Sequence, residues 1–445
     1  VEQAVAEAEP GQWIFGRGWH QEKWQQTPEP NVSGLPYHDA LSAVSPDNPV
    51  YLTHASGHAA MVNSRALEMA GIDRSTPDPP GGEIVRDRRG RAIGVLRETA
   101  ENLVGEQMDD EFDPALVRRM AELAAEECLS KGITSFQDAG VSLRQVEVLR
   151  EMAAAGELPV RLWMMFGQDN ETLAEALPGL RVYREGDDVL TVGGIKRYAD
   201  GALGSHGAWL LEPYADMPSS VGLNIDTPEV LREAASLAAE HGLQLCTHAI
   251  GDRANRETLD AYEEIIRDRP DGTALRWRIE HAQHIHPDDI PRFQQLGVIA
   301  AMQSVHCTSD GPWVEPRLGE ERARTGAYVW RSLLDTGAVI AGGTDAPVEP
   351  VDALPSFHAA VTRQMDDGTA FYPDQVMTRE EALRSMTLDA AYAAFEDDIK
   401  GSLEAGKLAD ITIVSKDIMS VPADQILEAE VLYTIVGGKV LYQAE

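Results

Sequence analysis

Four polar residues occupy positions where a parallel-strand enzyme carries its chemistry. His248, His281 and Asp345 each stand at the carboxyl end of a short apolar run, and Lys196 lies inside another such run. In α/β barrels the carboxyl ends of the strands carry the catalytic groups. Two imidazoles, a carboxylate and a lysine in this arrangement indicate a divalent metal site with a general base.

Each of these residues has a simpler interpretation when taken alone. A single histidine at a strand end is more often a hydrogen-bonded loop residue than a ligand. Asp345 could cap the turn that follows its strand, and Lys196 could extend to the rim of a barrel. Four such coincidences at strand ends favour a shared site. A lysine beside metal cations would be repelled or driven neutral, whereas a lysine that has reacted with CO₂ becomes an anion able to bridge two metals.

The elements that must position these residues alternate regularly from Asp113 onward. Helix-like and strand-like segments follow one another, which is typical of repeated βα units around a parallel sheet. The predicted strands are residues 133–136, 161–166, 192–199, 243–248, 275–281, 298–304 and 339–344. The predicted helices are residues 113–131, 143–155, 228–241, 254–267, 287–296, 324–335 and 379–395.

The seven predicted strands favour a (β/α)₈ TIM-like barrel whose first strand lies before Val1. A doubly wound open sheet is the alternative, but the sequence has no Gly-rich phosphate turn of the kind such sheets carry. We expect the barrel to comprise residues 1–9 and 106–400, with an inserted subdomain over 10–105. Residues 401–445 are predicted to form the C-terminal part of a small β-sandwich. Because Val1 opens within a helical pattern, we also expect the natural protein to begin upstream.

Several sequence motifs resemble the amidohydrolase superfamily. The barrel motifs are IKRYADGALGS, THAIGDRAN, RIEHAQHI, GGTDAPVEP and GSLEAGKLADITIV. The resemblance is strongest to the amidohydrolase family 3 branch, which includes N-substituted formamide deformylases. GRGWHQEKW and THASGHAAMVNSRAL are similar to the inserted segment of that branch.

The resemblance implies a (β/α)₈ barrel that holds one or two divalent ions, with zinc expected and Mn²⁺, Fe²⁺ or Ni²⁺ left open. His248 and His281 match the ligands of the fifth and sixth strands, and Lys196 matches a fourth-strand lysine that is often carboxylated. Asp345 matches the eighth-strand aspartate, which is both a ligand and the proton shuttle. The implied reaction is hydrolysis of an amide, formamide or cyclic amide C–N bond by metal-activated water.

One feature of the resembling family is absent from the chain. The family carries a His-x-His pair on the first barrel strand, and no such pair stands in that place here. His284 and His286 have the right spacing but follow the sixth predicted strand. We expect the pair to lie upstream of Val1. The alternative is a natural loss of the pair, which would leave at most one metal.

Four further residues are candidates for contacting the substrate. His54 and His58 lie in the inserted segment, and His306 and Asp310 follow the seventh predicted strand. A packed or surface role is an equal alternative for the first two histidines. Cys246 precedes His248 by two residues, and we expect it to be a small buried apolar residue.

Composition excludes several classes of function. The chain has 445 residues, 43% of them hydrophobic, and a net charge of −35 that disfavours nucleic acids and anionic membranes as partners. Its three cysteines imply no disulfide framework. We therefore expect a cytoplasmic enzyme with a small-molecule amide substrate, and we leave a homodimer open. The alternatives are an inactive barrel that binds ligands or partners, and a deaminase or isomerase of the same superfamily.

Overall fold

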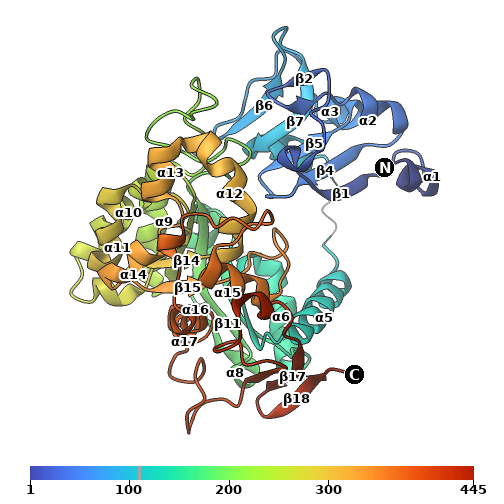
Figure 1. The fold of residues 1–445 in the computed structure, drawn as a ribbon. Coiled ribbons are helices and arrows are strands. Elements are labelled where there is room, and N and C mark those ends of the chain that lie inside the picture. Colours follow the sequence, from blue (N-terminus) through green and yellow to red (C-terminus); the bar gives the residue numbers. More distant parts are fainter. Residues whose placement is uncertain (109–111) are drawn as a thin grey trace. The chain divides into compact units, whose positions relative to one another are not determined.

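The structure is a computed structural model that describes residues 1–108 and 112–445. The chain divides into two compact units (Figure 1). The first comprises Val1–Phe112 and Asp200–Asp226, and the second comprises Asp113–Ala199 and Thr227–Glu445. The domain boundaries expected from the sequence stay a prediction. No helix in the described part of the chain is long and apolar enough to cross a membrane.

The second unit is built on a curled sheet whose main path runs in the order β15-β14-β13-β12-β11-β9-β8. These strands are β8 (Ser135–Val141), β9 (Arg161–Phe166), β11 (Leu190–Tyr198), β12 (Gln244–Ala249), β13 (Arg278–His281), β14 (Ile299–Met302) and β15 (Ile340–Gly342). All neighbours on this path are parallel, and β10 (Val182–Arg184) adds an antiparallel pairing to β11. A parallel sheet with helices between successive strands is the architecture of a TIM-like barrel, as the alternation in the sequence predicts.

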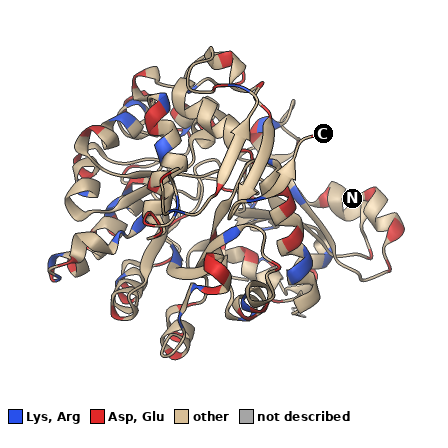
Figure 2. Cartoon of the chain, turned by 90° about the horizontal axis from the view of Figure 1, so that it is seen from below, with Lys and Arg blue, Asp and Glu red and all other residues tan. Residues whose placement is uncertain are grey.

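One helix of the second unit precedes its first strand, and the others lie between its strands in sequence. The helices are α5 (Pro114–Ser130), α6 (Leu143–Ala155), α7 (Asn170–Ala176), α8 (Glu185–Asp188), α9 (Pro228–His241), α10 (Asp252–Arg267), α11 (Ile290–Leu296), α12 (Ser304–Leu318), α13 (Glu320–Gly326), α14 (Trp330–Thr336), α15 (Ala353–Thr362), α16 (Arg379–Met386) and α17 (Leu388–Ala393). Figure 2 shows acidic and basic residues interspersed along the helices rather than separated by sign.

Helix boundaries follow the capping residues. The Thr227 side chain accepts a hydrogen bond from the amide of Val230 at the start of α9, and Gly242 ends that helix with a φ of 66°. Ser142 and Gln145 form a capping box at the start of α6. These signals are local, so the sequence predicts both helices correctly.

Other segments differ from the sequence prediction. The predicted helix over 324–335 is two helices, α13 and α14, and the helix over 379–395 breaks at Thr387 into α16 and α17. The strand predicted over 275–281 begins only at Arg278, because a 3₁₀ helix occupies residues 272–275. The sequence prediction has no helix in place of α12, which contains Pro312 and Pro316, residues that ordinarily interrupt helices.

The first unit has its own five-stranded sheet in the order β1-β4-β5-β7-β6. The strands are β1 (Ile14–Trp19), β4 (Val50–His54), β5 (Ala59–Val62), β6 (Gly82–Arg86) and β7 (Ala92–Glu98), with a small hairpin of β2 (Asn31–Val32) and β3 (Leu35–Pro36). The helices are α1 (Glu2–Glu7), α2 (Asp39–Val44), α3 (Ser64–Met69) and α4 (Asn102–Gly105). Val62, Leu67, Ile84 and Leu96 belong to one buried apolar cluster of this unit.

The C-terminal tail is a three-stranded antiparallel sheet of β16 (Ile411–Val414), β17 (Val431–Val436) and β18 (Lys439–Gln443). Gly437 and Gly438 turn the chain between the last two strands with φ values of 57° and 78°. A buried ion pair ties the tail to strand β9, because Asp410 accepts hydrogen bonds from Arg161 Nε at 2.7 Å and Nη2 at 3.0 Å.

Candidate metal centre

His248 and His281 lie on neighbouring strands at the carboxyl end of the parallel sheet. His281 ends β13 and pairs in register with Ala249, the residue after His248 on β12. Their imidazole rings meet edge to face, with centroids 4.5 Å apart. The structure therefore brings together two of the residues expected to bind metal.

His281, His306 and Asp345 form a group with the geometry of a metal site. Each offers one ligand atom, and the three atoms lie within 4.8 Å of one another. His306 Nε2 is 3.6 Å from the Oδ2 atom of Asp345. Imidazole nitrogens and a carboxylate oxygen suit Zn²⁺ and related divalent ions. The donors of His281 and Asp345 therefore fit the metal that the sequence predicts, and His306, which the sequence predicts to contact the substrate, lies beside them on α12.

The backbone at this group adopts conformations that non-glycine residues rarely take. His281 has a φ of 74° and Asp345 a φ of 59°. Left-handed conformations at such residues cost free energy and cluster at functional sites. Two of the strained positions of the chain are thus residues with candidate chemistry.

Two glutamines contact this group, and the sequence reasoning missed both. Gln303 Oε1 lies 2.8 Å from Nδ1 of His281, and Gln283 Nε2 lies 3.0 Å from Nδ1 of His306. Burial lowers the pKa of His306 to about 4. The sequence feature that could have identified these glutamines is their place near strand ends. Gln283 follows His281 by two residues, and Gln303 directly follows β14.

Lys196 is buried on β11, beside Cys246 of β12. Its Nζ lies 3.4 Å from the centroid of the Tyr198 ring and donates to the carbonyl of Arg197 at 3.3 Å. Burial raises the pKa of Cys246 to about 12, which keeps it a neutral thiol. The metal-bridging role of Lys196 stays a prediction.

Asp310 stands one helical turn after His306 on α12. It accepts a hydrogen bond from the hydroxyl of Tyr328 at 2.7 Å. The pKa of Tyr328 lies well above its ordinary value, chiefly because of burial and then because of the Asp310 charge. Asp310 thus contacts a buried phenol.

His54 and His58 lie in the first unit, with contacts from that unit. His54 is buried, and its ring nitrogens lie 2.8 Å from Ser56 Oγ and 3.0 Å from Gln21 Oε1. Burial lowers its pKa to about 3. His58 Nδ1 lies 2.8 Å from Oε2 of the buried Glu98. The substrate contacts expected of these two histidines stay a prediction.

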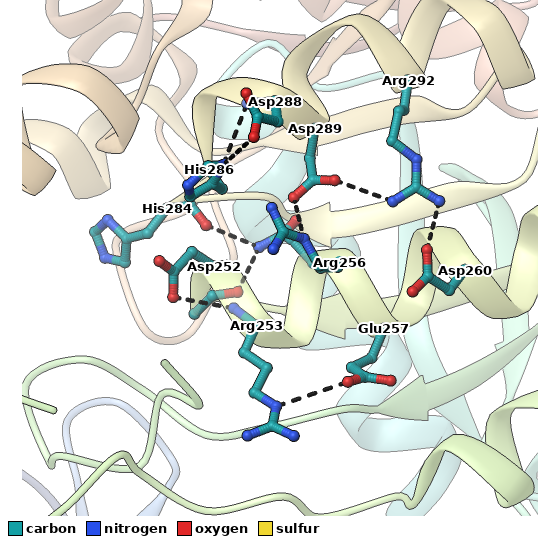
Figure 3. A network of polar contacts seen from close by, with 12 residues as sticks. Asp252, Arg253, Arg256, Glu257, Asp260, His284, His286, Asp288, Asp289 and Arg292 are labelled. Carbon is teal, nitrogen blue, oxygen red and sulfur yellow. Dashed lines mark hydrogen bonds and ion pairs between the residues drawn. The ribbon is translucent and has the colours of Figure 1, made fainter. Parts of the chain in front are cut away.

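His284 and His286 have the spacing of a metal-binding pair but not its geometry (Figure 3). His284 is buried with its ring against Tyr328, at a centroid separation of 5.6 Å, and burial lowers its pKa to about 3. The His286 side chain is 37% exposed and lies 3.6 Å from Asp288. The two rings have separate environments, so the pair does not replace a first-strand His-x-His pair.

A network of ion pairs surrounds the start of α10, directly after His248 (Figure 3). Arg256 Nε donates to Asp289 at 2.8 Å, and Arg292 contacts both Asp289 and Asp260, at 3.0 and 2.6 Å. Because these bonds join α10 to α11 and the residues before it, they fix the helices that follow the two histidine-bearing strands.

Known proteins match the whole length of the chain. It is 36% identical to the protein LONG AFTER FAR-RED 3 of Arabidopsis thaliana, over 99% of this chain and 76% of that protein. It is 29% identical to the N-substituted formamide deformylase of Arthrobacter pascens, over 100% of this chain and 81% of the enzyme. Among solved structures, an uncharacterized metal-dependent hydrolase of Pyrococcus horikoshii matches with a TM-score of 0.74 and 27% identity, over 95% of this chain and 80% of that one.

The amidohydrolase family model matches residues 1–442. This match and the relatives confirm the resemblance read from the motifs and the barrel class read from the alternating segments. The chain therefore belongs to the amidohydrolase family, as a metal-dependent hydrolase that acts on carbon–nitrogen bonds.

Proposed function

We propose that the chain hydrolyses the C–N bond of an amide, formamide or cyclic amide at a metal centre held by His248, His281 and Asp345. The observations that carry this proposal are that the ligand atoms of His281 and Asp345 lie within 4.8 Å of each other and that the ring of His248 meets that of His281 edge to face. An N-substituted formamide is the first substrate to try, because the N-substituted formamide deformylase matches this chain over its whole length at 29% identity.

A divalent ion at this place, zinc by its donor set, would supply electrophilic activation of the carbonyl and of an attacking water. Asp345 is the residue that handles the proton. Its side chain is 32% exposed, so its carboxylate can reach both water and substrate. It accepts the proton of the attacking water and delivers it to the leaving nitrogen. Amide hydrolysis needs this transfer, because an amide anion is a very poor leaving group.

Lys196 supplies a further metal-binding group in its carboxylated form. A carbamate formed on its Nζ, by addition of CO₂ with loss of a proton, would supply two oxygens that share one negative charge as ligands for divalent ions. Its burial on the strand next to His248 supports this role, since a buried ammonium beside cations is unfavourable. The three cysteines are buried free thiols, which agrees with a reaction in the cytoplasm.

The variant Asp345→Asn tests the proton transfer. We expect its kcat to fall by about 10²–10⁴-fold, the usual contribution of general acid–base catalysis. Asp366→Asn, at an exposed carboxylate, is the control and should keep the wild-type rate. A panel of N-substituted formamides, amides and cyclic amides supplies the substrates. Full activity of Asp345→Asn, or a wild-type protein inactive on the whole panel, would contradict the proposal.

A further inference from the structure

Two buried glutamines contact histidines of the metal centre through different atoms. Gln303 presents its oxygen to His281 Nδ1 at 2.8 Å, whereas Gln283 presents its nitrogen to His306 Nδ1 at 3.0 Å. The glutamines are 8% and 3% exposed. An amide oxygen only accepts hydrogen bonds and an amide nitrogen only donates them. The two contacts therefore require opposite protonation of the two Nδ1 atoms.

A second hydrogen bond sets the orientation of Gln303. Its Nε2 donates to the carbonyl of Ala301 at 3.0 Å. The oxygen of Gln303 is thus the atom that faces His281, and His281 must carry its proton on Nδ1. The Nε2 atom of the His281 ring then presents a lone pair. Acceptors that hold the Nδ1 proton of a metal-binding histidine orient the ring in this way.

His306 has the opposite arrangement. Its Nδ1 accepts a hydrogen bond from Gln283, so the single proton of the neutral ring is on Nε2. That Nε2 lies 3.6 Å from Oδ2 of Asp345. An N–H that faces a carboxylate is attracted to it, whereas a lone pair would be repelled. A protonated nitrogen has no lone pair for a metal, but it can donate a hydrogen bond.

We propose that Gln303 and Gln283 assign the two histidines to different tasks. Gln303 makes His281 a metal ligand, and Gln283 leaves the Nε2–H of His306, which has no hydrogen-bond partner in the described part of the chain, to donate to the carbonyl oxygen of the substrate. This inference rests on the proposed function, because it divides the work of that same site. It favours substrates whose carbonyl oxygen can accept a hydrogen bond beside Asp345.

The same substitution at the two positions tests the inference. Gln283→Glu puts an acceptor against Nδ1 of His306, so the ring proton should move from Nε2 to Nδ1. Gln303→Glu, the comparison variant, keeps an acceptor against Nδ1 of His281 and should leave the ring proton there, although it removes the donor to the Ala301 carbonyl. Nitrogen-15 ring shifts of the metal-free protein report both tautomers, with His281→Asn and His306→Asn variants to assign the signals. Circular dichroism checks that each variant is folded.

Metal binding and turnover give a second readout. Gln283→Glu should keep its zinc affinity, measured by competition with a chelator, while kcat/KM falls by about 10–100-fold. Gln303→Leu, which removes the acceptor from His281, should lower the zinc affinity itself by about 10–100-fold.

The nitrogen-15 spectrum of the wild-type protein tests the two tautomers even if a variant does not fold. A proton on Nδ1 of His306, or on Nε2 of His281, would overturn the inference, and so would an unchanged His306 tautomer in folded Gln283→Glu. The spectra need no turnover. A protein with these tautomers but no activity on amides would refute the proposed function and leave the tautomer assignment standing.

Discussion

The buried ion pair between Arg161 and Asp410 should be a main anchor of the C-terminal sheet. Its side chains are only 5% and 7% exposed. Asp410 Oδ1 also accepts a hydrogen bond from the amide of Gly437 at 2.8 Å, so one carboxylate joins strand β9 to the turn before β18. Asp410→Asn keeps the shape of this side chain and removes its charge.

The expected cost of Asp410→Asn follows from the environment of the guanidinium left behind. Arg161 Nη1 keeps hydrogen bonds to the carbonyls of Asp187 and Asp188, but these are long, at 3.3 and 3.2 Å. Removing one partner of a buried ion pair typically costs about 3–5 kcal/mol. The introduced amide can still accept from Gly437, so we expect a loss of about 3 kcal/mol in the free energy of unfolding.

Urea unfolding, followed by tryptophan fluorescence and by circular dichroism, measures this loss. Glu151→Gln is the matched control, because Arg118 and Glu151 form a 2.6 Å pair with side chains that are 32% and 70% exposed. That substitution should cost less than about 1 kcal/mol. The double variant Arg161→Leu/Asp410→Leu should cost less than the sum of its single variants, because it leaves no unpaired buried charge. If Asp410→Asn cost no more than Glu151→Gln, the reasoning would be refuted.

Two further predictions concern buried ionisable groups. Burial raises the pKa of Glu101 from 4.5 to about 7, and the hydrogen bond from Tyr51 opposes this shift in part. The stability that the folded state gains by holding the Glu101 proton is therefore fully present below pH 4.5 and is lost as pH rises to about 7. Glu101→Gln should therefore lose less stability than the wild type between pH 5 and pH 8, and equal pH profiles of thermal unfolding would contradict this. Lys196→Ala should remove any mass adduct of one CO₂ and lower the metal content, whereas Lys131→Ala, at a lysine 37% exposed, should do neither. A Lys196→Ala protein with full activity would exclude the bridging role.

The sequence predicts those parts of the fold that depend on local signals. Helix α9 has its capping threonine and its terminal glycine in place, and its bounds agree with the prediction. Helix α12 does not follow local rules, since it contains two prolines. It also carries buried residues such as His306, Trp313 and Val314. Burial of these side chains outweighs the local preference.

The candidate site likewise has residues that local sequence signals identify and residues that they do not. His248, His281 and Asp345 are recognisable because they lie at or just after the carboxyl ends of strands, and these ends meet at one edge of a parallel sheet. The roles of Gln283 and Gln303 depend on which histidine atom each faces, and that follows only from the contact between neighbouring strand ends. Spacing along the chain does not encode such a contact.

The central claim is that the strand-end residues hold a divalent ion. Elemental analysis of the purified, dialysed protein tests it most directly, with His281→Ala as the variant and His286→Ala, at a histidine 37% exposed, as the control. We expect at least about one ion per chain in the wild type and in the control, and its loss in His281→Ala. A wild-type protein with less than that, or a His281→Ala protein with its metal retained, would contradict the account.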